Sequence, residues 1–110
     1  KGQATLTLSA ARAAVGGEIA LRVQLQSTAR QPQQLVVDYA VHHVRANGGT
    51  SPKVFKGWKL TLAPGETRTL DKRHSLKPVT TRTLYPGTHT VDVRVNGVAL
   101  AAAAFELQAT

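Results

Sequence analysis

Apolar and polar residues alternate with a period of two along most of this chain. Leu6 and Leu8 alternate with hydroxyl residues, and residues 19–25 place Ile, Leu, Val and Leu at every second position. In an extended strand successive side chains point to opposite faces, so both segments predict half-buried β-strands. No segment has a convincing amphipathic helical pattern. The chain is therefore expected to fold from strands.

Further strands are predicted later in the chain. Residues 35–41 are apolar on one face and partly apolar on the other, which is typical of a central strand. A turn-rich loop is expected at residues 47–52, followed by strands near residues 54–62 and 67–76. The Ala63-Pro64-Gly65-Glu66 segment between these two strands has Pro and Gly at the central positions of a turn.

Two changes of parity predict β-bulges. Phe55 has the wrong parity for the face that carries Trp58, and an extra residue at Lys56-Gly57 would return it to the buried face. Asn96-Gly97 predicts a type I′ hairpin turn after the alternating valines of residues 91–95. The register of that hairpin would turn Val98, Leu100 and Ala102 towards the core, with Phe105 and Leu107 of opposite parity, so a second bulge is predicted near Ala103.

About seven strands with Gly- and Pro-containing turns predict an all-β fold, an immunoglobulin-like antiparallel β-sandwich. The 110 residues are the size of one domain, residues 1–110, without any cysteine for a disulfide. Tyr85-Pro86-Gly87 is placed as a tyrosine corner would be. The chain begins at Lys1 without a methionine or signal segment, so we expect a piece of a longer protein or a processed form. We further expect it to be cytoplasmic, monomeric and not bound to membrane.

Positive charge is concentrated in one third of the chain. The formal net charge is +8, and residues 45–82 hold nine basic residues against two acidic ones, a difference of +7. Lys and Arg neutralise phosphates, while hydroxyls and loop amides add short hydrogen bonds, so this composition favours a nucleic-acid backbone as partner. The alternative is that charges on exposed strands only provide solubility and protect sheet edges.

The candidate DNA-binding residues are eight of these nine basic side chains together with one histidine: Arg45, Lys53, Lys56, Lys59, Lys72, Arg73, His74, Lys77 and Arg82. We expect the loops at residues 45–53 and 77–85 to lie at the same end of the sandwich. There Lys53, Lys77 and Arg82 would hold phosphates, and His43 or His74 would donate neutral hydrogen bonds.

Metal binding and catalysis have little support in the sequence. His42 and His43 are adjacent, so in a strand they point to opposite faces and cannot bind one ion together. His89 shares the parity of the neighbouring valines, which favours a hydrogen-bonded core or corner residue. The scattered carboxylates offer no acid and base pair, and no serine has a nucleophile-elbow motif. Trp58 is interpreted as a core residue, with stacking on a base as the alternative.

Five segments, in this order, resemble a known family: residues 37–48, 51–56, 62–66, 72–75 and 85–89. The chain is similar to the C-terminal immunoglobulin-like domain of AlkC-type DNA alkylation repair proteins. The similarity is strong over residues 35–97 and weak before them.

That resemblance implies a longer protein in which HEAT-like helical repeats excise alkylated bases such as 3-methyladenine. This domain would help to grip duplex DNA near the lesion through its matching loops, without catalytic residues or a cofactor of its own. The competing hypothesis is a protein-interaction or scaffold module with no nucleic-acid role. A third, a secreted adhesion-type module, is disfavoured by the resemblance.

Overall fold

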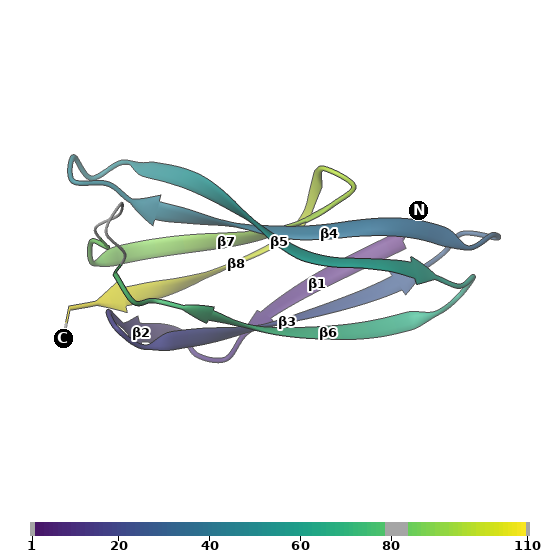
Figure 1. The fold of residues 1–110 in the computed structure, drawn as a ribbon, viewed down its shortest axis with the longest axis horizontal. Helices are drawn as coiled ribbons and strands as arrows, with labels where there is room; N and C mark the ends of the chain where they lie inside the picture. The colour runs from purple at the N-terminus through teal and green to yellow at the C-terminus, as the bar shows by residue number, and fades with distance from the viewer. Residues whose placement is uncertain (1, 79–83, 110) are drawn as a thin grey trace.

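The computed structural model describes residues 2–78 and 84–109, which form two packed β-sheets (Figure 1). The strands are β1 (Gly2–Leu8), β2 (Arg12–Ala14), β3 (Glu18–Ser27), β4 (Gln33–Val44), β5 (Thr50–Leu62), β6 (Thr67–Ser75), β7 (Gly87–Val95) and β8 (Val98–Gln108). The described residues contain no helix, and hence none long and apolar enough to cross a membrane. The predicted all-β sandwich is confirmed.

The two sheets have three and five strands. Their orders are β1-β3-β6 and β2-β8-β7-β4-β5, so β4 is an internal strand, as its two apolar faces predicted. All pairs are antiparallel except β2 with β8, which run parallel. β2 is the strand that the sequence analysis did not predict, because three residues are too few to show a period.

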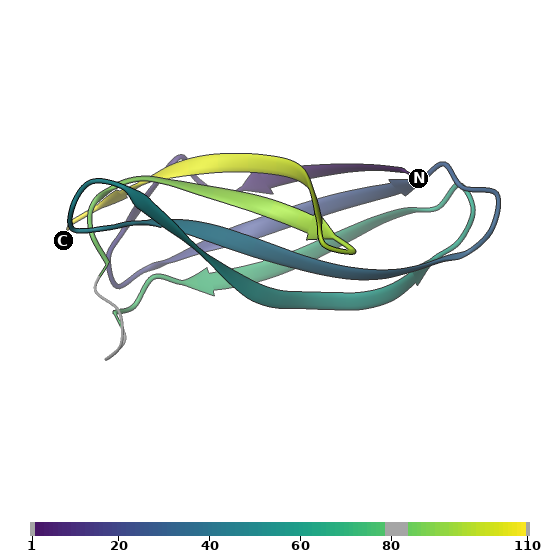
Figure 2. The ribbon, with the colours of Figure 1, turned by 90° about the horizontal axis from the view of Figure 1, so that it is seen from above.

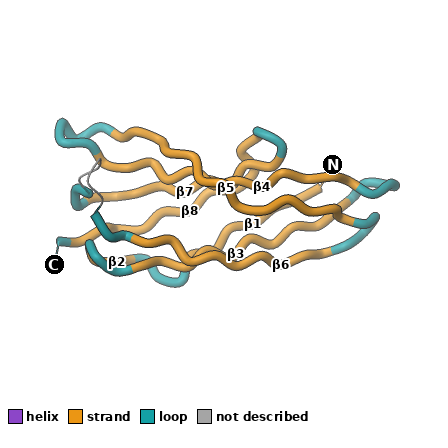
Figure 3. The backbone as a smooth tube through the Cα atoms, in the orientation of Figure 1, coloured by secondary structure: helices purple, strands orange, loops and turns teal. Residues whose placement is uncertain are grey.

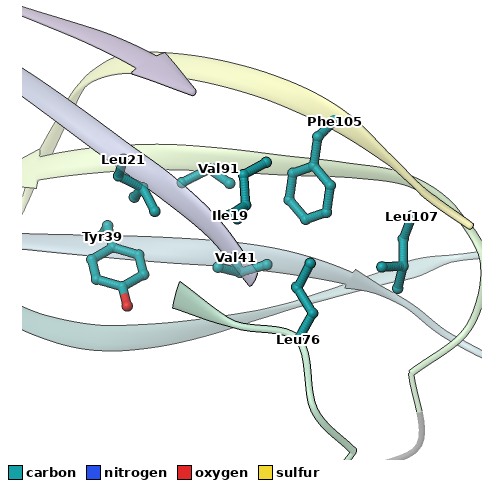
Figure 4. Close-up of a cluster of buried hydrophobic side chains, with 8 residues drawn as sticks. All are labelled: Ile19, Leu21, Tyr39, Val41, Leu76, Val91, Phe105 and Leu107. Carbon is teal, nitrogen blue, oxygen red and sulfur yellow. The ribbon is translucent and has the colours of Figure 1, made fainter. Parts of the chain in front are cut away.

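The core consists of two clusters between the sheets. Figure 4 shows the first, in which Phe105, Tyr39 and Leu21 come from both sheets; its buried members are Ile19, Leu21, Tyr39, Val41, Leu76, Val91, Phe105 and Leu107. The second contains Val23, Leu25, Leu35, Val37, Leu62 and Val93. Trp58 is half-buried against the second cluster, in line with its interpretation as a core residue.

The predicted bulge in β5 is confirmed. Val37 of β4 lies opposite Trp58, but the next residue, Asp38, lies opposite Lys56, so Gly57 is the extra residue. Phe55 thereby faces Tyr39, with the two rings stacked at a centroid distance of 5.3 Å. The bulge keeps both aromatic residues of β5 on the core side.

The bulge in β8 exists, but the predicted position was wrong. Val93 of β7 lies opposite Ala101 and Arg94 lies opposite Ala99, so Leu100 is the extra residue instead of Ala103. Leu100 is 48% exposed, whereas Phe105 lies opposite His89 and is buried. The predicted inward orientation is wrong for Ala102, which lies opposite Asp92 of the outer face. Val98 lies opposite Val95 on the core side, as predicted, although it is 58% exposed.

Two loop predictions also need correction. The loop expected at residues 47–52 is shorter, because β5 already begins at Thr50 and a hydrogen bond of 2.7 Å from the Arg45 amide to the Gly49 carbonyl closes the turn. Tyr85 is 36% exposed, so it does not form a buried tyrosine corner, and Leu84 packs against the first cluster instead.

The sandwich is elongated, with principal extents of 47 × 22 × 20 Å. Most turns gather at its two ends (Figure 3). The β4–β5 turn, the end of β6, the start of β7 and the C-terminus lie at one end, and the N-terminus lies towards the other (Figures 1 and 2). The expectation that the loop segments around Arg45 and Lys77 share one end is thus confirmed for the described residues.

Candidate nucleic-acid interface

Three of the predicted basic residues lie along one exposed edge strand. β5 is the outer strand of the five-stranded sheet, and Lys53, Lys56 and Lys59 are all exposed on it. An extended strand advances about 3.3 Å per residue, so these ammonium groups are carried over a length of roughly 20 Å. None of the three forms an ion pair within residues 2–78 and 84–109.

The β5 bulge decides which way these lysines point. Lys56 and Lys59 are three residues apart, a spacing that would place them on opposite faces of a regular strand. Because Gly57 is the extra residue, Lys56 lies opposite Asp38 and Lys59 opposite Val36, which share the outer face of β4. Lys53 lies opposite Val41 and therefore on the other face of β5. Sequence analysis named Lys56 and Lys59 but placed the contact in loops. It did not infer that they share a face, although the predicted bulge already implied it.

The basic residues of β6 are more engaged than those of β5. Lys72 is half-buried, with its Nζ donating to the Lys56 carbonyl at 3.4 Å and lying 6.0 Å from the centroid of the Trp58 ring. Arg73 lies 3.6 Å from Glu18 in an exposed pair. Lys72 thus connects β6 and β5, the neighbouring edge strands of the two sheets. The ion pair of Arg73 is exposed, and exposed ion pairs contribute little to stability.

At the end of the sandwich, Arg45 and Lys77 are exposed and outside any ion pair that the described structure contains. The start of β7 approaches the first of these segments at Gly87, where an added Cβ would lie 3.1 Å from a methyl group of Val44. Arg82, also predicted here, lies outside the described residues.

The histidines are placed differently from the cationic side chains. His74 is 7% exposed, its Nδ1 lies 3.0 Å from the Tyr39 hydroxyl, and its ring packs edge-on against Phe55. His43 is 8% exposed and contacts the buried His89 ring. Both rings belong to the interior, so we leave them out of the interface proposed below.

A polar cluster on the outer face of the five-stranded sheet went unnoticed in the sequence. Asp92 accepts from Arg94 Nε at 2.9 Å, and its second oxygen lies 2.7 Å from His42 Nε2. Burial alone would raise the pKa of Asp92, but the hydrogen bonds from Arg94 and His42 outweigh it and lower the pKa from its ordinary value of 3.8. Asp92 and Arg94 are two residues apart and therefore point to the same face of their strand, which was the sequence signal for this ion pair.

His42 and His43 do point to opposite faces, as predicted: one contacts Asp92 on the outer face and the other contacts His89 in the interior. Over the described ranges, no three His, Asp or Glu side chains are grouped so as to hold a metal ion. The feature with a chemical use is the group of exposed lysine side chains on β5, whose ammonium groups can attract and bind phosphate oxygens.

The family model described as "Uncharacterised protein YhaZ, C-terminal Ig-like domain" matches residues 3–109. This chain belongs to that family. The YhaZ C-terminal Ig-like family therefore accounts for nearly the whole chain, and the immunoglobulin-like part of the predicted fold is confirmed.

Two relatives are similar in sequence. YhaZ of Bacillus subtilis is 32% identical over 92 residues, which are 84% of this chain and 25% of that protein. The solved structure of the Pseudomonas fluorescens alkylpurine DNA glycosylase AlkC, bound to DNA containing an abasic site analog, is 39% identical, with a TM-score of 0.94 over 97% of this chain and 30% of that chain. This YhaZ-type domain thus spans about a quarter to a third of the relatives' length, and the predicted resemblance to AlkC is confirmed.

More distant structures share the fold alone. A β-glucosidase from Listeria innocua in complex with laminaribiose superposes on 97% of this chain with a TM-score of 0.76 at 16% identity. At such low identity the likeness shows only that the same sandwich occurs in other proteins.

Proposed function

We propose that this chain is the C-terminal, non-catalytic DNA-binding domain of a longer DNA repair protein of the alkylpurine DNA glycosylase type. The observation that carries the proposal is the match to AlkC, which extends over 97% of this chain at 39% identity and was made with a DNA-bound protein. Excision would belong to the remainder of the longer protein, which we expect to contain HEAT-like repeats. A DNA partner in bacteria implies a cytoplasmic location.

In this proposal the β5 edge and the β4–β5 turn hold the duplex backbone. Lys56 and Lys59 present their ammonium groups on the outer face of β5, and Lys53, on the other face of the strand, adds charge next to the β4–β5 turn. From Lys53 to Lys59 the strand extends over roughly 20 Å, which is the length of about six base pairs at 3.4 Å per step. Arg45 and Lys77 add charge at the same end. Contacts of this kind carry no sequence information, so we expect little sequence preference.

The remaining predicted residues have smaller roles. Lys72 is held by the Lys56 carbonyl and the Trp58 ring, and Arg73 is paired with Glu18, so we expect each to contribute less than an unpaired lysine. Trp58 itself is half-buried against the core, which argues against stacking on a base.

The competing scaffold hypothesis makes a different prediction for the same lysines. Lysines on a sheet edge prevent association with another edge, and they would do so without any DNA partner. In that case their removal would change the tendency to self-associate and leave DNA affinity unaltered.

The test is a charge-removal series in the longer protein, titrated with duplex DNA at several salt concentrations. Lys53→Ala, Lys56→Ala and Lys59→Ala should each weaken binding and flatten the log–log salt dependence by about 0.9 for every phosphate that is no longer neutralised. Arg12→Ala and Arg30→Ala, which also remove exposed charges but lie away from β5, are the matched controls. Equal effects in both sets, or none in the lysine set, would reject the proposed surface.

A further inference from the structure

One of the two adjacent histidines of β4 lies on the same surface as two of the β5 lysines. His42 lies opposite Pro52 of β5, on the outer face of the five-stranded sheet. Lys56 and Lys59 lie opposite residues 38 and 36 of β4, so both share this face with His42. The His42 side chain is 28% exposed. An accessible imidazole therefore lies between Lys56 and the β4–β5 turn, which forms part of one end of the sandwich (Figure 1).

The hydrogen bond to Asp92 decides which nitrogen of the His42 ring carries a proton. His42 Nε2 lies 2.7 Å from Asp92 Oδ2. Although burial alone would raise the pKa of Asp92, its hydrogen bonds with Arg94 and His42 lower the pKa from the ordinary value of 3.8, so the carboxylate is ionised at neutral pH. An ionised carboxylate only accepts hydrogen bonds, so Nε2 is the donor. In the neutral ring Nδ1 is then an acceptor, and it becomes a donor only when the ring is protonated.

The surroundings of the ring leave Nδ1 available to a ligand. Within residues 2–78 and 84–109, the bond to Asp92 is the only hydrogen bond of the His42 ring. The residues opposite the ring, Pro52 on β5 and Thr90 on β7, carry no charge. The charged side chains that share the outer face with the ring are Asp38 on β4, Lys56 and Lys59 on β5, Asp92 and Arg94 on β7, and Glu106 on β8.

The net charge of the cluster around Asp92 depends on the His42 ring. Arg94 donates to both oxygens of Asp92, from Nε at 2.9 Å and from a terminal nitrogen at 3.4 Å, so these two residues together carry no net charge. Protonation of the ring would therefore add one full positive charge to the face that carries Lys56 and Lys59. A neutral ring would instead turn an acceptor towards an approaching phosphate oxygen, which is itself an acceptor.

We propose that His42 is a further DNA-binding residue, whose ring takes up a proton from solution as duplex DNA binds and donates a hydrogen bond from Nδ1 to a backbone phosphate. The bond from Nε2 to Asp92 stays intact, and the Asp92 carboxylate stabilises the positive ring. Asp92 is thus a positioning residue, and Arg94 holds it in place. The inference rests on the proposed function, in which Lys56 and Lys59 hold the same duplex.

The expected signature is an affinity for DNA that falls as the pH rises. Imidazole is the side chain whose charge changes between about pH 5 and pH 8, whereas lysine and arginine stay protonated throughout this range. The complex favours the protonated ring, so the affinity should be highest at the acidic end. Loss of one charge-assisted hydrogen bond should weaken binding by at least about threefold across this range.

The test is titration of the longer protein with duplex DNA at constant ionic strength, from about pH 5.5 to about pH 8. The parent protein should show the full loss of affinity. His42→Gln, whose amide takes up no proton, should bind with nearly constant affinity. Gln24→His is the matched control, because it adds an exposed imidazole on the outer face of the three-stranded sheet, and it should keep the pH profile of the parent.

A second measurement follows the His42 ring directly in the parent protein. The NMR resonance of its Hε1 proton reports protonation, and the ring should keep its proton to a higher pH in the DNA complex than in the free protein. The inference is overturned by a ring that titrates identically in both states, by a His42→Gln variant with the pH profile of the parent, or by an equal change of profile in Gln24→His.

The same experiments separate this inference from the DNA-binding proposal. If Lys56→Ala and Lys59→Ala weaken binding while His42→Gln keeps the pH profile of the parent, only the role of His42 is rejected. If the lysine variants bind DNA as the parent does, the proposed surface is rejected whatever the histidine does.

Discussion

Replacement of Gly57 by alanine should destabilise the domain, because the β4 backbone leaves no space for a side chain there. A Cβ at this position would lie 2.6 Å from the Val37 carbonyl oxygen and 3.5 Å from its carbonyl carbon. These atoms belong to an internal strand that is paired on both sides, with Val37 opposite both Trp58 and Val95. The backbone therefore cannot move away without disturbing two ladders.

The expected cost of Gly57→Ala is about 1–3 kcal/mol, the range for forcing an extra methyl group into a packed site. For a domain of this size that corresponds to a fall in Tm of roughly 4–20 °C. Urea unfolding can be followed by the fluorescence of Trp58, the only tryptophan of the chain, and by far-ultraviolet circular dichroism. Agreement of the two probes verifies that the transition is two-state.

Gly49→Ala is the matched control for Gly57→Ala. An added Cβ there would lie 3.2 Å from Asn47 Oδ1, which accepts a 2.9 Å hydrogen bond from the Gly49 amide. Both residues are exposed in a turn, so at most this one hydrogen bond is lost, and we expect a cost of no more than about 1 kcal/mol for the control. If Gly57→Ala were as stable as Gly49→Ala, the close approach of β5 to β4, and with it the account of the bulge, would be refuted.

Three further predictions concern the stability of the sandwich. Asn96→Ala should lower the free energy of unfolding in urea by about 1–2 kcal/mol, because it removes the 2.9 Å hydrogen bond from the Val36 amide and places alanine at a φ of 50°. Asn96→Gly should cost less, since glycine adopts this φ without strain. Equal losses in the two variants would contradict this account. Asp92→Asn should be less stable than the parent at neutral pH, because the carboxylate bonded by Arg94 stabilises the fold. This contribution is complete above pH 3.8 and is lost as the pH falls through the lowered pKa of Asp92 in the folded protein. The stability difference between the two proteins should therefore shrink on acidification, and a difference that stays constant would contradict the prediction. Phe105→Ala should cost about 3–5 kcal/mol by calorimetry because the ring is 2% exposed in the core, and a loss below about 1 kcal/mol would contradict that burial.

The order of amino acids along the chain was sufficient to predict the fold class and much of the local structure. Alternation identified seven of the eight strands, the Asn96-Gly97 turn joined the last two, and the parity of Phe55 located the Gly57 bulge. These features depend on neighbouring residues along one strand, so the pattern of the chain is enough to reveal them. Clustering of basic residues near β5 and β6 is likewise visible without the structure.

Features that depend on pairing between distant segments emerged only from the three-dimensional arrangement. Parity required one extra residue before Phe105, but only the pairing with β7 located it at Leu100. The position of His74 in its strand did not reveal that its ring lies within hydrogen-bond distance of the Tyr39 hydroxyl. The ion pair between Arg73 and Glu18 likewise joins two strands that are far apart in sequence. The difference arises because periodicity is a local property of the backbone, whereas burial, ion pairing and edge exposure are set by which strands lie side by side.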